Sequence, residues 1–208
     1  MKIAVLTTPN QWFETKVYEL VKELNCALYF NHQNVVGYDI VFILSYHLII
    51  PEDILQKNKH NIVIHASDLP QGKGWAPLFW QVLEGKNEIV FSMFEAGNGI
   101  DNGDIYMKKT LKLSGYELNE ELREKQANLT IEMCKDFIKN YDKYKNPTPQ
   151  KGEETFYKKR TSIDSELDIN KTIKEQFNLL RIVNNEEYPA FFEMNGYKYK
   201  IKIEKMES

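Results

Sequence analysis

The chain has 208 residues, of which 42% are hydrophobic, and this composition predicts a folded globular protein and excludes a disordered one. Its net charge of −3 disfavours a nucleic-acid partner, because nucleic-acid binders usually carry a basic excess that neutralises phosphates. No stretch approaches the about 18 apolar residues of a membrane span, and the two cysteines have no metal-like spacing. We therefore expect a cytoplasmic protein with no membrane partner and no metal.

The first half of the chain alternates short apolar runs with amphipathic segments. Apolar runs bounded by turn residues are typical of buried strands, and apolar residues three and four apart are typical of helices. We expect helices at 12–24 and from 51 onwards, and strands at 2–6, 26–30, 40–44, 62–64 and near 89–94. This alternation predicts an α/β fold, with a Rossmann-like, mostly parallel sheet that has helices on both faces.

The second half begins with a long predicted helix over 118–144, which the proline-containing run 145–150 ends. We therefore expect a Rossmann-like domain at 1–146 and a small C-terminal subdomain at 147–208. In this subdomain the sequence predicts a helix around 172–183 and a hairpin over 190–203, because Asn-Gly at 195–196 separates two alternating strands. The hairpin and the many tyrosines and phenylalanines are expected to offer apolar surface for a homodimer.

Two polar, glycine-rich clusters could carry chemistry. His65 ends the apolar run 62–64 and opens a Gly- and Pro-rich loop, and Asp101 lies in the segment 97–105, which holds three glycines. Ligands of parallel sheets bind beyond the carboxyl ends of the strands, where we expect both clusters. There a histidine and an aspartate could form a base and its orienting carboxylate. A structural histidine and a solvated turn are the alternative interpretations.

The order and spacing of these residues resemble the 10-formyltetrahydrofolate-dependent formyltransferase family. That family's pattern is His-x-Ser-x-Leu-Pro, then a basic residue with Gly and Pro, and later Gly-x-Asp-x-Gly-Asp-Ile. Residues 65–77 and 99–105 match both halves in order and spacing, and residues 45–51 resemble the family's loop after the preceding strand. Residues 157–191 resemble the tail of the branch that formylates amino groups of nucleotide-linked sugars, as in pseudaminic-acid-type pathways.

The resemblance implies formyl transfer from 10-formyltetrahydrofolate, as cosubstrate, to the amino group of a nucleotide-linked amino sugar, expected to be a UDP-4-amino-4,6-dideoxy sugar. His65 would act as general base or position the amine, and Asp101 would orient or charge-balance His65. The cofactor-binding residues that the resemblance implies are His47, Leu48, Ile49, Trp75, Gly97, Asn98, Gly99, Ile100 and Asp101. Trp75 would stack on a flat ring or, as the alternative, anchor a half-buried loop. Lys73 is expected to be solvated, with a phosphate contact as the alternative.

The sequence departs from the family pattern at Val63, where relatives carry an asparagine two residues before the histidine. Strand alternation places Val63 on the same face as His65, so the expected oxyanion donor, worth ~3 kcal/mol, is missing. Asn61 lies roughly 6–7 Å further back along the strand and is not expected to reach. Protonated His65, a backbone N–H, Ser67 or Asn98 are the remaining candidate donors.

Three other functions are alternatives to the sugar enzyme. A glycinamide-ribonucleotide formyltransferase would share the length, the histidine and the aspartate, but residues 74–80 and the tail after 149 speak against it. A methionyl-tRNA formyltransferase is expected to carry a larger, basic C-terminal domain, whereas this chain is acidic and short after its linker. A non-catalytic folate or sugar-nucleotide binding module is favoured only by Val63.

Overall fold

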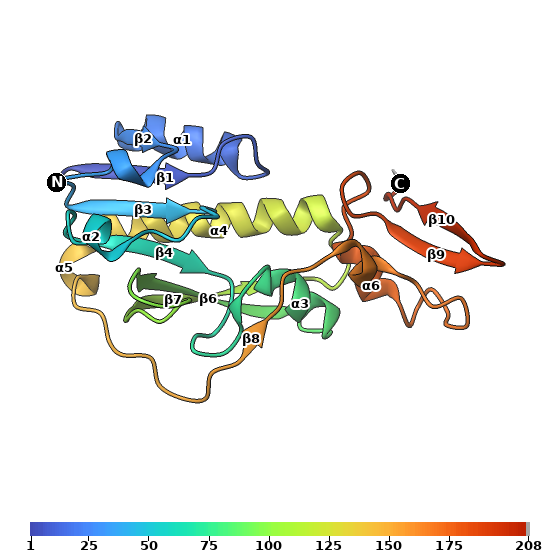
Figure 1. Cartoon of the computed structure of the whole chain (residues 1–208). Coiled ribbons are helices and arrows are strands. Elements are labelled where there is room, and N and C mark those ends of the chain that lie inside the picture. Colours follow the sequence, from blue (N-terminus) through green and yellow to red (C-terminus); the bar gives the residue numbers. More distant parts are fainter. Residues whose placement is uncertain (207–208) are drawn as a thin grey trace.

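The computed structural model describes residues 1–206, and its centre is a six-stranded sheet (Figure 1). In spatial order the strands are β2 (Ala27–Tyr29), β1 (Ile3–Thr7), β3 (Ile40–Leu44), β4 (Asn61–His65), β6 (Glu88–Glu95) and β7 (Ile105–Lys112). The first four run parallel, whereas β6 is antiparallel to β4 and β7 is antiparallel to β6. The predicted α/β fold with a mostly parallel sheet is therefore confirmed.

One face of the sheet shares a large hydrophobic core with three helices, α1 (Glu14–Leu24), α3 (Pro77–Leu83) and α4 (Asn119–Lys139). Strand β3 shows how an uninterrupted apolar run serves two cores, because alternate side chains of a strand point to opposite faces. Phe42 lies in this larger core, while its neighbours Val41 and Ile43 lie in a second core.

The second core covers the opposite face of the sheet and is smaller. It includes Val35, which follows the 3-10 helix η1 (His32–Asn34), and Leu55, the last residue of the one-turn helix α2 (Glu52–Leu55). Helices therefore lie on both faces, as predicted, but those on this face are only one turn long.

Helix α4 is the longest helix of the described residues and follows β7, the last strand of the six-stranded sheet in chain order. It begins where the backbone N–H of Leu118 donates to the Glu121 carboxylate at 2.8 Å, and acidic residues in the first turn also favour the positive end of the helix dipole. Asn140 interrupts the helix, and the one-turn helix α5 (Tyr141–Tyr144) follows. No helix within residues 1–206 is long and apolar enough to cross a membrane.

The C-terminal segment starts with a linker that returns to the sheet. Its first strand, β8 (Phe156–Tyr157), pairs in parallel with β5 (Lys73–Gly74), and the elements after it are η2 (Ser162–Ser165), α6 (Phe177–Ile182), β9 (Ala190–Met194) and β10 (Tyr197–Ile201). The predicted hairpin is confirmed, with positive φ angles at both turn residues, 52° at Asn195 and 80° at Gly196. Residues 207–208 of the expected subdomain lie outside the described residues.

The helix expected over 172–183 is shorter than predicted. Gln176 accepts a hydrogen bond from the backbone N–H of Asp168 at 2.6 Å and donates to its carbonyl at 3.0 Å. These bonds hold residues 168–176 in turns, because a side chain that pairs with the backbone competes with helical hydrogen bonding. Only residues 177–182 of the expected stretch form α6.

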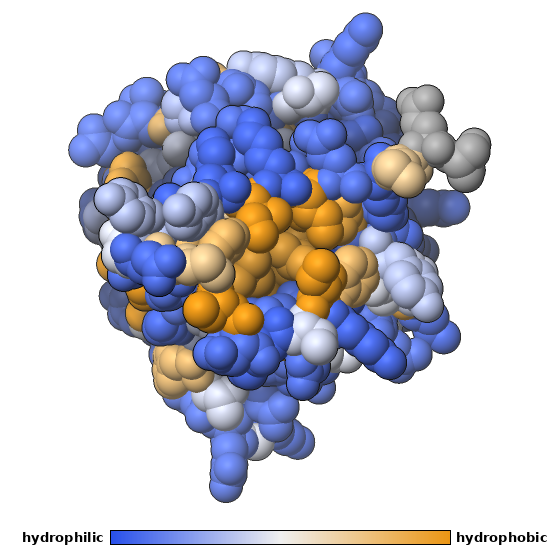
Figure 2. Space-filling model, turned by 90° about the vertical axis from the view of Figure 1, so that its right-hand side faces the viewer, coloured by the Kyte–Doolittle hydropathy of each residue, from blue (hydrophilic) through white to orange (hydrophobic). Residues whose placement is uncertain are grey.

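Apolar side chains are exposed on the side of the molecule that carries α6 and the hairpin. Figure 2 faces this side and shows an apolar patch surrounded by polar residues. The large apolar side chains that this part of the chain exposes include Ile169, Ile173, Met194, Tyr197 and Tyr199. The expectation that the C-terminal segment offers apolar surface therefore agrees with the structure.

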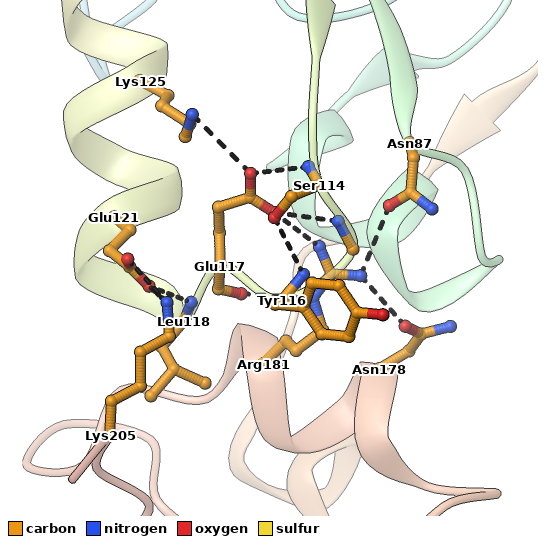
Figure 3. A network of polar contacts seen from close by, with 11 residues as sticks. Asn87, Ser114, Tyr116, Glu117, Leu118, Glu121, Lys125, Asn178, Arg181 and Lys205 are labelled. Atoms are coloured by element: carbon orange, nitrogen blue, oxygen red, sulfur yellow. Dashed lines mark hydrogen bonds and ion pairs between the residues drawn. The ribbon is translucent and has the colours of Figure 1, made fainter. Parts of the chain in front are cut away.

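A buried ion pair attaches α6 to the connection between β7 and α4 (Figure 3). The Arg181 guanidinium donates to the Glu117 carboxylate at 3.3 Å and to the Glu117 carbonyl at 3.1 Å, and it also reaches Asn178 at 3.1 Å. Both charged side chains are almost fully buried. A buried charge that loses its partner is strongly destabilising, so this pair holds the C-terminal segment against the sheet domain.

Candidate active site

His65 is the last residue of β4 and is 8% exposed. Its Nε2 lies 2.8 Å from the carbonyl oxygen of Gly72 and 3.7 Å from Oδ2 of Asp101. Since a carbonyl and a carboxylate can only accept hydrogen bonds, both neighbours favour a hydrogen on this ring nitrogen. The two predicted catalytic side chains therefore lie side by side.

Asp101 is held in an unusual backbone conformation. Its φ of 51° is in the left-handed region, which is uncommon for residues other than glycine, and the backbone N–H of Gly74 donates to its Oδ2 at 2.8 Å. A Cβ atom at Gly103 would lie 1.5 Å from the carbonyl oxygen of Glu95, so only glycine fits there. We call residues 96–104 the Asp101 loop and residues 66–76 the His65 loop.

The two loops reach each other by a route that the sequence analysis did not predict. Both clusters were expected beyond the same edge of the sheet, but β6 is antiparallel to β4. Ile62 pairs with Glu95 and His65 with Ser92, so the Asp101 loop starts three strand residues, roughly 10 Å, from His65. The Asp101 loop must therefore turn back along the sheet, where it meets the Gly72–Gly74 part of the His65 loop.

Lys73 is not solvated, and that expectation is wrong. The side chain is 1% exposed, and its ammonium group donates to the Asn102 side-chain oxygen and to the Glu154 carboxylate, the latter at 2.5 Å. Burial of an ammonium group is costly unless it is paired, and these two acceptors provide the pairing. Lys73 thus connects the two loops to the linker after α5.

The candidate oxyanion donors differ in whether their polar groups already make hydrogen bonds. The amide group of Asn61 donates to the carbonyl of Leu55 at 2.9 Å, and that of Asn98 donates to Glu52 at 2.6 Å. Ser67 is 1% exposed, and its hydroxyl has no hydrogen-bond partner within residues 1–206. Val63 packs against the smaller core. Of these three side chains, Ser67 is therefore the one whose polar group makes no hydrogen bond within the described residues.

The predicted cofactor residues fall into two groups. The loop after β3 exposes His47, Leu48 and Ile49, and the Asp101 loop exposes Gly97, Asn98, Gly99 and Ile100. The hydrogen bond from Asn98 to Glu52 brings the Asp101 loop to α2, directly after the β3 loop. Trp75 follows Gly74 in the chain and is half-exposed, with the Lys159 ammonium group 5.1 Å from its ring centre. Within residues 1–206 no hydrogen bond joins Trp75 to the other predicted cofactor residues.

Sequence reasoning missed the part of the site that the linker supplies. The Gln150 amide nitrogen donates to the carbonyls of Asp101 and Gly103, at 2.7 and 2.8 Å. Glu154 and Asn102 pair with Lys73. The sequence offered no local signal for these contacts, because a lysine between two loop glycines has the same pattern whether it is solvated or buried. No cluster of three His, Cys, Asp or Glu side chains that could hold a metal ion is found in residues 1–206.

A comparison with protein families agrees with this geometry. The formyl transferase family model matches residues 2–136, so the chain belongs to the formyl transferase family. The chain is 28% identical over 165 residues to the methionyl-tRNA formyltransferase of Francisella philomiragia, covering 78% of this chain and 52% of that protein. It is 36% identical over 125 residues to the Rickettsia bellii methionyl-tRNA formyltransferase, covering 60% and 41%. The chain spans about half the length of the curated relatives it matches.

Solved structures show the same fold. A methionyl-tRNA formyltransferase from Clostridium thermocellum superposes with a TM-score of 0.83 at 22% identity, covering 100% of this chain and 94% of that one. A 4-N formyltransferase from Francisella tularensis gives a TM-score of 0.76 at 17% identity, covering 100% and 99%. HypX from Aquifex aeolicus, in complex with tetrahydrofolic acid, gives 0.72 at 16% identity, covering 98% and 37%.

Proposed function

We propose that this protein transfers the formyl group of 10-formyltetrahydrofolate to the amino group of a nucleotide-linked amino sugar, with a UDP-4-amino-4,6-dideoxy sugar as the expected acceptor. The observation that carries the proposal is the His65–Asp101 pair, 3.7 Å apart, in a chain of the formyl transferase family. Histidine beside a carboxylate is a common arrangement for proton transfer at neutral pH.

In the proposed reaction the acceptor nitrogen attacks the formyl carbon, and the bond from that carbon to N10 of the folate then breaks. His65 takes the proton that the acceptor amine loses and passes it to N10, which leaves as an N–H group, so that His65 ends the reaction in its starting state. Asp101 stabilises the imidazolium ion that forms, because the carboxylate lies beside the ring. Protonated His65, a backbone N–H and Ser67 remain the candidate donors to the oxyanion; the Ser67 hydroxyl is unengaged within the described residues but buried.

The folate would bind over the two exposed loops. Leu48, Ile49 and Ile100 are 62%, 89% and 57% exposed, and a flat ring system would cover them. The similarity to HypX, whose structure contains tetrahydrofolic acid, supports a folate cosubstrate. Trp75, directly after Gly74, would add an aromatic ring that contacts either the folate or the amino sugar.

Charge and similarity support different acceptors. The net charge of −3 favours a small nucleotide-linked sugar over tRNA. The fold does not separate the two acceptors, because solved structures of a methionyl-tRNA formyltransferase and a 4-N formyltransferase both superpose on this chain. Methionyl-tRNA is the second candidate, because the curated relatives at 28% and 36% identity are methionyl-tRNA formyltransferases. Glycinamide ribonucleotide and a purely binding role are the remaining alternatives.

The organisation around the site is also part of the proposal. Residues 1–146 would form the catalytic domain and residues 147–208 a small C-terminal subdomain. Its exposed apolar side chains would provide the interface of a homodimer. The cytoplasmic location follows from the sequence alone and stays a prediction.

An acceptor panel tests the proposal. Purified protein is incubated with 10-formyltetrahydrofolate and, in separate reactions, with UDP- and TDP-linked 4-amino sugars, initiator methionyl-tRNA and glycinamide ribonucleotide. We expect one amino sugar to gain a formyl group by mass, and His65→Ala and Asp101→Ala to abolish the gain. Formylation of methionyl-tRNA alone would replace the acceptor, and folate binding without any transfer would favour a binding module.

A further inference from the structure

We propose that residues 148–157 act as a strap that holds the His65 and Asp101 loops together, with Gln150 as the positioning residue for Asp101. The inference rests on the proposed function, because it concerns how the same catalytic pair is held. The strap follows α5 along the sheet domain and ends in β8 (Figure 1).

Gln150 fixes the Asp101 loop through both hydrogens of one amide group. Its Nε2 donates to the carbonyls of Asp101 and Gly103, the two residues on either side of Asn102. Its Oε1 is buried and has no partner within residues 1–206. An unpaired buried acceptor is unfavourable, and the two hydrogen bonds of the amide nitrogen offset this cost in the observed orientation.

The other end of the strap fixes the His65 loop through the backbone. The Gly72 N–H donates to the Thr155 hydroxyl at 2.8 Å, and the Lys73 N–H donates to the Thr155 carbonyl at 2.9 Å. The Trp75 N–H donates to the Tyr157 carbonyl at 3.1 Å. The held segment is the one whose Gly72 carbonyl faces His65 and whose Gly74 N–H faces Asp101. The strap therefore fixes a partner of each catalytic side chain.

Two further contacts tie the strap to the Asp101 loop. Thr148 and Ile105 exchange two backbone hydrogen bonds, at 2.7 and 2.9 Å, directly after the loop. The buried Lys73 ammonium group donates to Glu154 of the strap and to Asn102 of the loop. Removal of the strap would leave Lys73 without its carboxylate and Asp101 without the contact that fixes its left-handed backbone.

This arrangement has a consequence for turnover. Asp101 is a loop residue with a φ of 51°, a left-handed conformation that aspartate adopts more readily than most residues and that the loop contacts hold in place. If the loop relaxes, the carboxylate moves away from His65, and a displacement of about 1 Å in a catalytic group can cost ~100-fold in rate. We expect the strap to act mainly on the chemical step. Within the described residues its hydrogen bonds to the segment 96–105 go to Asp101, Gly103 and Ile105, and none goes to the exposed residues 97–100 over which the folate would bind.

Gln150→Ala tests the strap, with Lys151→Ala as the matched control, because Lys151 is the neighbouring residue and is exposed. We expect Gln150→Ala to lower kcat about 10- to 100-fold, with KM for folate and acceptor within about threefold, and Lys151→Ala to leave both unchanged. In an Asp101→Asn background, Gln150→Ala should lower kcat less than about twofold, because it acts through Asp101. An equal loss in both backgrounds would show a merely structural role and overturn the proposal.

Amide hydrogen exchange provides a readout that does not depend on turnover. Gln150→Ala should speed exchange in peptides that cover 72–75 and 99–104, and Lys151→Ala should not. Unchanged exchange in these peptides would overturn the strap even if the enzyme is active. If the wild-type protein formylates no acceptor, the proposed function fails, while faster exchange in Gln150→Ala would still support the strap.

Discussion

The buried Glu117 carboxylate, which pairs with Arg181, should make the stability of the protein depend on pH. Burial by itself raises the pKa of Glu117, but the backbone N–H of Ser114, at 2.7 Å, and the nearby Lys125 charge lower it. The net result is that the pKa falls from its ordinary value of 4.5 to about 2. The carboxylate is therefore held in its charged form by the folded state.

The magnitude follows from this change in pKa. A fall from 4.5 to about 2 corresponds to about 3 kcal/mol of folding free energy at neutral pH. Because the folded-state pKa is the lower one, this contribution is complete well above pH 4.5 and is lost as the pH falls from there toward 2. Glu117→Gln removes the charge and leaves Arg181, which is 1% exposed, without its carboxylate.

Urea unfolding at several pH values tests this reasoning. We expect Glu117→Gln to lower the free energy of unfolding by about 3 kcal/mol at pH 7, and the difference from wild type to shrink as the pH falls below 4.5. Glu120→Gln is the matched control, because Glu120 is exposed in the first turn of α4. It should change the free energy of unfolding by no more than about 0.5 kcal/mol. A difference below about 1 kcal/mol at pH 7, or one that does not change with pH, would refute the account.

Two further predictions concern the Asp101 loop and the cysteines. Gly103→Ala places a methyl group against the Glu95 carbonyl, at a distance of 1.5 Å before any relaxation. We expect kcat to fall ~100-fold in a steady-state assay, because the Asp101 loop must move. Activity within about threefold of wild type would contradict the described loop path. Burial raises the pKa of both Cys26 and Cys134, and Cys134 is fully buried. A thiol reagent should therefore modify Cys26 slowly and Cys134 only on unfolding. Peptide mass mapping that finds Cys134 modified first would contradict the packing.

The strands could be predicted from the sequence because their signals are local, and the family motif pointed to His65 and Asp101 as a candidate pair. The run Ile40–Leu44 is apolar throughout and became β3 with the predicted bounds. His65 ends β4 and Asp101 lies beside it, as the motif spacing implied. The direction of β6 could not be predicted, because an apolar strand reads the same whether its neighbour is parallel or antiparallel.

The linker contacts could not be predicted because they join residues that are far apart in the chain. Lys73 and Glu154 are 81 residues apart, and Gln150 and Asp101 are 49 apart. A lysine beside loop glycines has the same local pattern whether it is solvated or buried. Only the return of the linker to the sheet decides between the two, and its Pro-containing sequence has no periodicity that indicates where it returns.

The central claim is formyl transfer through His65 and Asp101, and the stoichiometry of the two products tests it most directly. Protein is mixed with 10-formyltetrahydrofolate and the amino sugar selected from the panel, and tetrahydrofolate and formylated sugar are counted by mass spectrometry. We predict one tetrahydrofolate released for each formylated sugar, and a parallel fall of both products, by the same factor, to a residual rate in Asp101→Asn. Tetrahydrofolate release without a formylated sugar, or full activity in Asp101→Asn, would contradict the account.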